Sequence, residues 1–381
     1  MKKILITGGA GFIGSELTIK LLERGHKIRI LDNLSAQVHG DDPATTSSSF
    51  RKLLANPAIE FILGDVTDRE ILGKALEGME VVVHLAAETG AGQSMYEIER
   101  YTDVNIGGTA LLLDILTNGK HQVKKIVIAS SRAIYGEGKY FSSELGIVYP
   151  GSRKEEDLRQ GEFEVKYKGA TTPLELRPTD ESSKIHPTSL YGITKQVQEQ
   201  MIMTLAPAIG IAAVGFRYQN VYGPGQSLRN PYTGILSIFS TLIKSGKGLN
   251  IFEDGKESRD FVYIEDVVAA TVAGIEKPEA DNEVFNVGSG VATDVLTVAR
   301  SLMQIYQTEV PLTISGNYRI GDIRHNYADL SKIERELGFK PKWDLLSGLS
   351  EFCRWVNKME IVGNRYEESL QEMKTRGLLK Q

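Results

Sequence analysis

Residues 7–17 read TGGAGFIGSEL, the strongest indication of the fold in this sequence. An apolar run ends just before its glycines, and a helical pattern begins at residue 13. Gly8, Gly11 and Gly14 recur at every third position, which permits a tight turn and lets backbone N–H groups approach a phosphate. A strand, a glycine turn and a helix in this order predict a dinucleotide-binding turn, with a glycine-rich turn that binds nothing as the alternative.

Two aspartates end the next apolar runs. Asp32 closes residues 27–32, at the distance expected for a carboxylate that accepts hydrogen bonds from the adenosine ribose. Such a carboxylate repels a 2′-phosphate, so the sequence favours NAD over NADP. Asp65 closes residues 59–65 and could accept a hydrogen bond from adenine, and a helix N-cap is the alternative.

Short apolar runs alternate with helical patterns through the first half of the chain. The predicted strands cover residues 2–7, 27–32, 59–65, 81–87, 124–130 and 212–218, and the predicted helices cover 13–24, 68–77, 98–118 and 190–206. Strands separated by helices need crossover connections, which predicts an α/β fold with a doubly wound parallel sheet. Later helices are expected at 233–245, 264–276, 294–307, 329–337 and 345–358, and a weaker one in the tail, 359–381. Residues 137–187 are polar and contain four prolines, so we expect an insertion or an ordered surface excursion.

The composition excludes several classes of function. The net charge is −5 and the pI about 5.8, which argues against a nucleic-acid partner. No apolar run approaches the roughly 18 residues of a membrane span, and the N-terminus is interpreted as a strand rather than an export signal. The single cysteine, Cys353, excludes an internal disulfide and fits the cytoplasm. The histidines are scattered, so we expect no metal site, and His84 is interpreted as a hydrogen-bonded histidine at a strand end.

A tyrosine and a lysine share one helical face in SLYGITKQVQE, residues 189–199. Tyr191 and Lys195 are four residues apart, and a nearby ammonium or nicotinium charge favours the phenolate. Tyr191 could then take a proton from a sugar hydroxyl while a hydride leaves for a nicotinamide. Ser131, at the end of a predicted strand, can hydrogen-bond the same hydroxyl. Pairs spaced like this are common on helices, but this one follows a dinucleotide turn and a strand-end serine.

Further motifs follow the glycine turn in order: GDVTD, HLAAETG, NIGGT, SSRAIYG, YGITK, FRYQNVYGPG, SRDFVYIEDV, FNVGSG and GDIRHNYAD. With them the chain resembles, over nearly its whole length, the NAD-dependent epimerase/dehydratase family of extended short-chain dehydrogenases. The resemblance implies a Rossmann domain over residues 1–220 and a smaller domain over 221–381 that binds a nucleotide-diphosphate sugar. Some later segments are expected to return to the first domain. A homodimer formed through paired helices is also implied.

The resemblance assigns roles to individual residues. Tyr191 matches the catalytic tyrosine, Lys195 the lysine that orients the cofactor ribose, and Ser131 the serine or threonine that precedes the YG pair. For the cofactor site it implies Gly8, Gly11, Phe12, Ile13, Gly14, Asp32, Asn33, Asp65, Val66, Leu85, Ala86, Ala87, Asn105, Tyr191 and Lys195. For the substrate site it implies Ser131, Asn220, Arg259, Arg319 and Asp322, and residues 228–239 match a loop over the sugar and nucleotide.

Two of these assignments have alternatives, and Asn220 has an unusual neighbour. Arg259 would grip the diphosphate through bidentate contacts, with a surface salt bridge as the alternative. Asp322 could instead be a turn or cap residue. Gln219 replaces the usual phenylalanine beside Asn220, so the packing there is open.

Arg132 and Ala133 help to separate chemistries within the family. Members that eliminate water place Asp-Glu after the serine or threonine, and decarboxylating relatives place a glutamate nearby. Arg132 and Ala133 cannot act as a carboxylate base, so the remaining serine, tyrosine, lysine and NAD suit reversible oxidation of one alcohol. That predicts an epimerase that inverts C4 through a 4-keto sugar, with tightly held NAD. Arg132 itself is expected to be a solvated charge, and a contact with the substrate or the insertion is the alternative.

Within the family the chain is most similar to the dTDP-L-rhamnose 4-epimerase group, which interconverts dTDP-L-rhamnose and dTDP-6-deoxy-L-talose for surface polysaccharides. Many members of that group carry paired cysteines in the insertion, and this chain has none there. The alternatives are an epimerase of a UDP- or CDP-sugar, a nucleotide-sugar reductase or dehydrogenase, and a catalytically silent NAD-binding scaffold. The nucleotide base, the sugar and the epimerised carbon stay open.

Overall fold

The computed structural model describes the whole chain except residues 229, 231, 233 and 361–365. Parts of the predicted substrate loop and of the predicted tail helix fall on these positions and therefore lie outside the described residues.

A seven-stranded sheet forms the centre of the molecule, in the order β13-β9-β5-β4-β1-β2-β3. Its strands are β1 (Lys3–Thr7), β2 (Lys27–Asp32), β3 (Ile59–Leu63), β4 (Val81–His84), β5 (Lys125–Ser131), β9 (Ala212–Tyr218) and β13 (Glu283–Val287). Every neighbouring pair is parallel, which confirms the predicted doubly wound Rossmann sheet. The strand order reverses between β1 and β4, and dinucleotides bind outside the carboxyl ends of strands at such a switch point.

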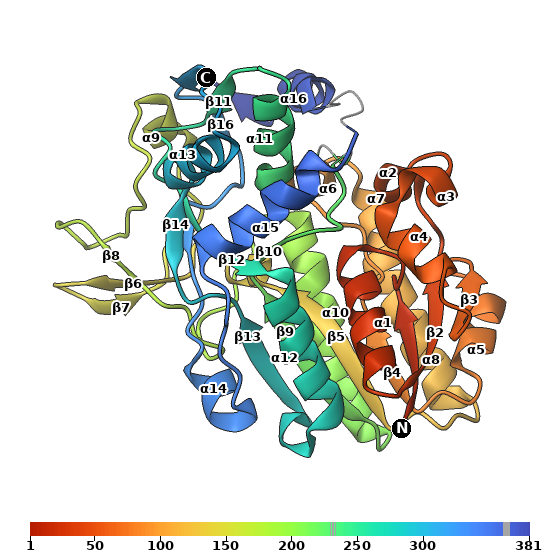
Figure 1. Cartoon of the computed structure of the whole chain (residues 1–381). Helices are drawn as coiled ribbons and strands as arrows, with labels where there is room; N and C mark the ends of the chain where they lie inside the picture. The colour runs from red at the N-terminus through yellow and green to blue at the C-terminus, as the bar shows by residue number, and fades with distance from the viewer. Residues whose placement is uncertain (229, 231, 233, 361–365) are drawn as a thin grey trace.

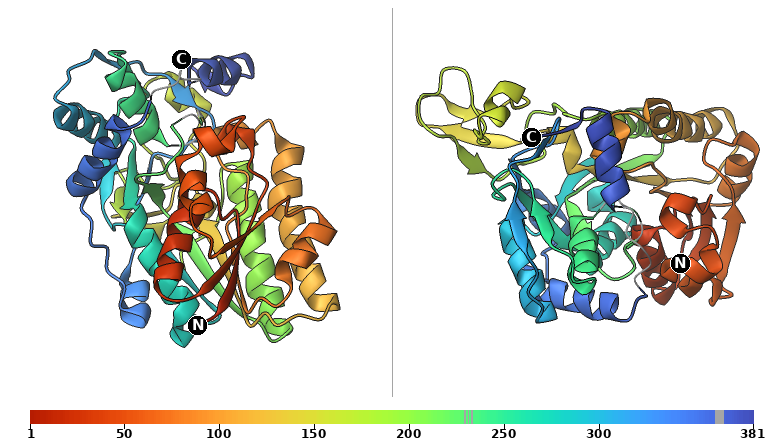
Figure 2. Two further views of the ribbon diagram at one scale, coloured as in Figure 1. Left: turned by 45° about the vertical axis from the view of Figure 1, so that its right-hand side comes forward. Right: turned by 90° about the horizontal axis from the view of Figure 1, so that it is seen from above.

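Alternate side chains of each strand enter two separate hydrophobic layers. Ile4 and Ile6 belong to one layer and Leu5 to the other, as the two-residue period of a strand requires. The first layer faces α1 (Phe12–Glu23) and α12 (Ile264–Glu276), and the second faces α5 (Arg69–Leu76), α8 (Gly108–Asn118) and α10 (Leu190–Ala208). Helices therefore cover both faces of the sheet (Figure 1 and Figure 2).

The later part of the chain builds a smaller set of strands around β12 (Ser258–Tyr263). This strand pairs with β10 (Asn220–Tyr222), β14 (Ala292–Asp294) and β17 (His325–Asn326). Two short sheets join β11 (Leu249–Ile251) to β15 (Leu312–Ile314), and β16 (Tyr318–Arg319) to β18 (Leu379–Lys380). The helices of this part are α11 (Ile235–Lys244), α13 (Val295–Tyr306), α14 (Ser331–Leu337), α15 (Leu345–Asn357) and α16 (Tyr366–Thr375). One hydrophobic cluster extends from the α1 and α12 layer into this part, so the two regions share a continuous core.

The insertion is an ordered projection, as expected. It contains an antiparallel sheet of β6 (Lys139–Ser142), β7 (Gly146–Val148) and β8 (Glu175–Arg177), with α9 (Glu155–Arg159) beside it. The sheet extends away from the main sheet (Figure 1; Figure 2, right). Tyr140, Val148 and Val165 form its small core. The Glu144 carboxylate accepts hydrogen bonds from residues on both arms of the projection: Ser142, Ser143, Thr171 and Thr172.

The remaining elements are short. They are α2 (Ala36–His39), α3 (Pro43–Thr46), α4 (Ser48–Leu54), α6 (Ala91–Ser94), α7 (Ile98–Tyr101), η1 (Thr102–Gly107), η2 (Arg132–Tyr135) and η3 (Pro278–Ala280). Within the ranges that the structure covers, no helix is long and apolar enough to cross a bilayer. Strand β13 joins the main sheet although it lies beyond residue 220, and the division into two domains at that residue stays a prediction.

Candidate active site

The glycine turn between β1 and α1 is packed too closely for side chains. Gly8 has φ +68°, and a Cβ there would lie 2.8 Å from the Ala86 nitrogen. A Cβ on Gly14 would lie 2.5 Å from the Gly8 carbonyl oxygen. The turn borders a cavity of about 520 Å³ that runs along the carboxyl ends of the strands. Because backbone N–H groups can approach a ligand only where such a Cβ is missing, the cavity fits the pyrophosphate of NAD.

Nearly all the predicted cofactor residues line this cavity. They are Gly8, Gly11, Phe12, Ile13, Gly14, Asp32, Asn33, Asp65, Val66, Leu85, Ala86, Ala87, Tyr191 and Lys195. Asn105 is different, because it is fully buried and does not line the cavity. Its amide bonds both backbone groups of Glu88 and the Thr194 hydroxyl, so it holds α10 against the loop after β4.

The acidic end of the cavity is ordered by its own hydrogen bonds. Asp32 accepts from the Ala10 and Leu34 backbone N–H groups, each at 2.9 Å. Asn33 donates to Asp65 at 2.8 Å. Burial acts to raise the pKa of Asp65, but hydrogen bonds from Thr67 and Asn33 lower it overall, so the carboxylate is ionised at neutral pH. Segment 35–51, which the sequence reasoning did not assign, supplies further lining residues beside Asp32.

Ser131, Tyr191 and Lys195 line the same cavity, on the side of β5 and α10. Burial raises the pKa of the Tyr191 phenol, while a hydrogen bond with Ser131 and the charge of Arg132 lower it. Lys195 donates to the Ala129 carbonyl at 2.9 Å, and burial lowers its pKa to about 7. Gly192 permits the close approach of α10 to the segment after Ser131, since a Cβ there would lie 2.7 Å from the Ala133 carbonyl oxygen.

A buried polar network supports this end of the site. Glu199 accepts from Ser130 at 2.5 Å and forms a two-pronged ion pair with Arg217. Arg217 also donates to the Tyr135 hydroxyl at 2.7 Å. The sequence reasoning missed Glu199, although its spacing of four residues from Lys195 places both on one helix face. The network fixes α10 against β5 and β9, which carry Ser131 and the wall of the site.

His84 behaves as predicted. Its ring nitrogens pair with the Thr7 and Thr109 hydroxyls at 2.8 and 3.1 Å. Burial, followed by the charge of Lys195, lowers its pKa to about 3, so it is neutral at physiological pH. His84 is therefore a structural residue of the strand end.

The predicted diphosphate residues are not among those that line this cavity: Asn220, Arg259, Arg319 and Asp322. Arg259 is buried, and its terminal nitrogens bond the Ser258, Ile323 and Arg324 carbonyls and, at 2.9 Å, the Asp322 carboxylate. Only its Nε remains to donate to a ligand. Burial acts to raise the pKa of Asp322, but nearby arginines lower it to about 2: Arg259, Arg319, Arg153 and Arg132. The Arg319 guanidinium lies over the Phe252 ring, 4.9 Å from its centroid.

Arg132 is not the solvated charge that we expected. It is half-buried, and its Nε donates to the Asn220 side-chain oxygen at 3.0 Å. Burial and the neighbouring Arg259 charge lower its pKa to about 10. The expectation was wrong because the partners of Arg132 come from β10 and β12, far away in the sequence.

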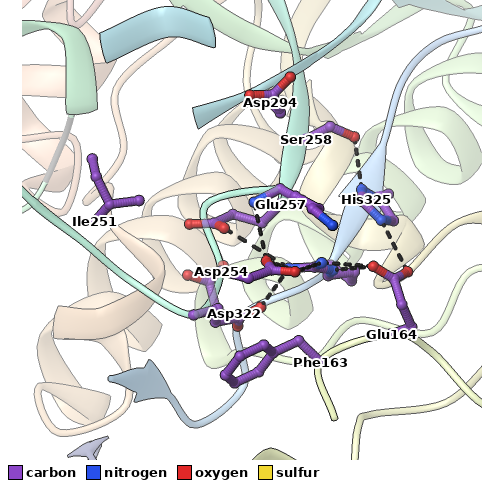
Figure 3. Close-up of polar contacts among 12 residues, drawn as sticks. Phe163, Glu164, Ile251, Asp254, Glu257, Ser258, Asp294, Asp322 and His325 are labelled. Carbon is purple, nitrogen blue, oxygen red and sulfur yellow. Dashed lines mark hydrogen bonds and ion pairs between the residues drawn. The ribbon is translucent and has the colours of Figure 1, made fainter. Parts of the chain in front are cut away.

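The insertion reaches this region through a group of ion pairs. Arg324 has no exposed surface and bonds Glu164 of the insertion and Glu253 and Asp254 of the loop after β11. Figure 3 shows Glu164, Asp254 and Glu257 gathered near Asp322, with His325 between Ser258 and Glu164. Arg153 of the insertion donates to Glu253 at 2.7 Å and to the Asp322 carbonyl at 3.0 Å. The insertion is therefore tied to the residues that surround Arg259.

Known proteins are similar in sequence to this chain over almost its whole length. A "dTDP-L-rhamnose 4-epimerase" of Burkholderia thailandensis is 38% identical over 357 residues, 93% of this chain and 95% of that protein. A "putative UDP-glucose 4-epimerase" of Methanocaldococcus jannaschii is 32% identical, over 93% of this chain and 98% of that protein.

Solved structures of nucleotide-sugar 4-epimerases are also similar to this chain over almost its whole length. A UDP-glucose 4-epimerase of Thermotoga maritima with UDP-glucose has a TM-score of 0.73 at 31% identity, covering 93% of this chain and 99% of that one. A UDP-glucuronic acid 4-epimerase of Bacillus cereus with UDP-glucuronic acid and NAD has a TM-score of 0.75 at 27% identity, covering 94% of this chain and 100% of that one. Residues 4–159 and 167–288 match the family described as "NAD dependent epimerase/dehydratase family". With its glycine turn, its aspartate and its serine, tyrosine and lysine in place, the chain belongs to the NAD-dependent epimerase/dehydratase family.

Proposed function

We propose that this NAD-dependent enzyme is a nucleotide-sugar 4-epimerase whose substrate is a dTDP-6-deoxyhexose, with dTDP-L-rhamnose and dTDP-6-deoxy-L-talose as its two epimers. The observation that carries the proposal is Ser131 beside Tyr191, with Arg132 and Ala133 in the next two positions. The relative that is 38% identical supports the choice of sugar and base.

Ser131 and Tyr191 carry out the proton chemistry in this proposal. Both hydroxyls approach the sugar C4 hydroxyl, and Tyr191 takes its proton and later returns it. Burial raises the pKa of Tyr191 overall, and the Ser131 hydrogen bond and the Arg132 charge oppose it by favouring the phenolate. NAD, which the glycine turn and Asp32 would hold, would supply the acceptor for the C4 hydride and the donor for its return to the opposite face of the sugar.

An elimination would need further acid and base groups, which this segment lacks. Ala133 has no proton to exchange, and Arg132 stays protonated at neutral pH. The nearest buried carboxyl on the same segment, Glu137, accepts from the Arg324 N–H at 2.7 Å and lies 3.4 Å from Arg153. Glu137 is thus engaged by Arg153 of the insertion and by Arg324 just before β17, which disfavours a role in dehydration.

A UDP-sugar is the second candidate substrate, because the putative UDP-glucose 4-epimerase is 32% identical over 93% of this chain. We also infer a homodimer in the cytoplasm, as the family resemblance and the single buried cysteine suggest.

The direct test is NMR of the purified protein with a panel of nucleotide sugars, headed by dTDP-L-rhamnose and UDP-hexoses, with no cofactor or reductant added. We expect a second epimer at equilibrium and no net NADH. Tyr191→Phe should lower the rate by about 10²–10⁴-fold without abolishing nucleotide binding. Turnover that begins only after NAD(P)H is supplied would support a reductase, and no turnover of any sugar would support a silent scaffold.

A further inference from the structure

Arg132 has hydrogen-bonding capacity that the rest of the protein does not use. Its Nε is fixed by Asn220, which orients the guanidinium plane. Across the part of the chain that the structure covers, its two terminal nitrogens make no hydrogen bond or ion pair, and they are not sealed from solvent. These nitrogens therefore offer a planar fork of N–H groups to a ligand.

The fold places this fork beside the predicted diphosphate site. Asn220 on β10 is in register with Phe261 on β12, two residues from Arg259. The Arg259 charge is close enough to lower the pKa of Arg132, after burial. The half-buried Arg132 and the buried Arg259 repel each other, and Asp322 offsets part of this repulsion. An anion that binds between two such guanidinium groups stabilises both.

Arg259 cannot hold a diphosphate by bidentate contacts in this conformation. Its terminal N–H groups already donate to three carbonyl oxygens and to Asp322, which leaves only Nε. A phosphate that reaches this site needs another donor pair, and among the described residues both Arg132 and Arg319 have terminal nitrogens without a hydrogen bond. Of the two, Arg132 directly follows the catalytic Ser131 in the sequence.

We propose that Arg132 binds the sugar-bearing phosphate of the substrate through its two terminal nitrogens and so fixes the distance from the diphosphate to the Ser131–Tyr191 pair. This inference rests on the proposed function, because it needs a nucleoside-diphosphate sugar as the substrate. It makes Arg132 a substrate-binding residue that also positions the reacting sugar carbon.

The test compares nucleotides that differ by one phosphate. Calorimetric titration of the NAD-loaded enzyme with dTDP, dTMP, UDP and UMP shows which base the wild-type protein prefers. In that series Arg132→Met should weaken the binding of the nucleoside diphosphates by about 10–100-fold, the loss expected for hydrogen bonds to a charged group. The affinity for the monophosphates should stay within about twofold of the wild-type value. Arg177→Met, which removes an exposed arginine of the insertion, should change neither affinity.

A pH profile separates this role from a merely structural one. Because Arg132 lowers the pKa of Tyr191 in the free enzyme, Arg132→Met should move the acidic limb of kcat/KM to higher pH. Arg132→Lys keeps the positive charge, so the acidic limb of kcat/KM should stay at its wild-type pH. The same variant should lose most of the affinity for the diphosphate, because lysine cannot form the bidentate contact.

Two results would overturn the inference: equal weakening of diphosphate and monophosphate in Arg132→Met, or no weakening of either. If the wild-type protein binds no nucleoside diphosphate at all, the proposed function fails and this inference fails with it, so the two failures are distinguishable.

Discussion

Lys195 carries its charge in a place that disfavours it. The side chain is 3% exposed, and burial lowers its pKa from 10.5 to about 7. Between these two pH values the folded protein binds fewer protons at this group than the unfolded chain does. The contribution of Lys195 to stability therefore increases as pH rises through this range, and the charged lysine is most unfavourable at pH 7 and below.

Lys195→Met should accordingly stabilise the NAD-free protein while abolishing activity. We expect a gain of about 1–3 kcal/mol in unfolding free energy at pH 6–7, decreasing toward pH 10. Denaturant unfolding across this pH range measures it, with Lys27→Met as the control because Lys27 is exposed. A gain that does not change with pH would contradict the buried charge.

Gln219 is a second residue whose burial is unfavourable. It is 4% exposed and lines the cavity, and among the described residues neither its amide oxygen nor its amide nitrogen has a hydrogen-bond partner. Gln219→Met keeps the length of the side chain and removes the amide, so we expect a gain of about 1–2 kcal/mol in unfolding free energy. The matched variant Gln198→Met should lose stability, because Gln198 donates to the Thr109 hydroxyl at 2.8 Å. Equal losses in the two variants would show that the Gln219 amide is hydrogen-bonded in solution.

At the scale of elements, the start of α10 decides where Tyr191 lies. A Cβ on Gly192 would come within 2.7 Å of the Ala133 carbonyl oxygen and 2.8 Å of Pro187. Gly192→Ala should push α10 away from η2 and lower kcat by about 10–100-fold, because small displacements of a reacting group are costly. Gly73→Ala in α5 has open space around it and should leave kcat unchanged and add up to about 1 kcal/mol of stability. Unchanged kcat in Gly192→Ala would mean that this contact does not position the tyrosine.

The elements that could be predicted from the sequence are those with a clear local pattern of apolar, glycine or capping residues. The glycine turn, six strands of the sheet and the long helices have clear patterns, and the structure contains them. Strand β13 was not predicted, because its short apolar run is interrupted by Asn286, whose side chain bonds Tyr135 and the Thr179 carbonyl. Helices α2, α3 and α4 were not predicted either, since helices this short depend on packing, such as that of Phe50 and Leu53 into the core.

At the scale of the whole molecule, Arg324 joins three distant segments. It lies just before β17 and pairs with Glu164 of the insertion and with Glu253 and Asp254. Arg324→Met leaves these carboxylates without their buried partner and should cost about 3–5 kcal/mol in unfolding free energy. It should also raise hydrogen exchange across residues 137–187. The exposed pair of Arg335 and Glu336 provides the control, because Arg335→Met should cost less than about 1 kcal/mol. A similar small loss in both variants would contradict a structural role for the Arg324 cluster.

Site residues could be predicted where a motif within one segment identifies them. They could not be predicted where the contact joins segments far apart in the sequence. Tyr191 and Lys195 lie on one helix, and Asp32 follows its strand directly. Arg132 is held by a hydrogen bond to Asn220, 88 residues away in the sequence. A terminal nitrogen of Arg259 donates to Asp322, 63 residues away. A single sequence without a fold cannot give such contacts.

The central claim is inversion of C4 by removal and return of the same hydride, and isotope tracing tests it most directly. The measurement is NMR of the enzyme as purified with dTDP-L-rhamnose deuterated at C4, in ordinary water, without added NAD or reductant. We expect dTDP-6-deoxy-L-talose that keeps its deuterium at C4. Talose product with hydrogen at C4, or no second epimer while dTDP binds tightly, would contradict it.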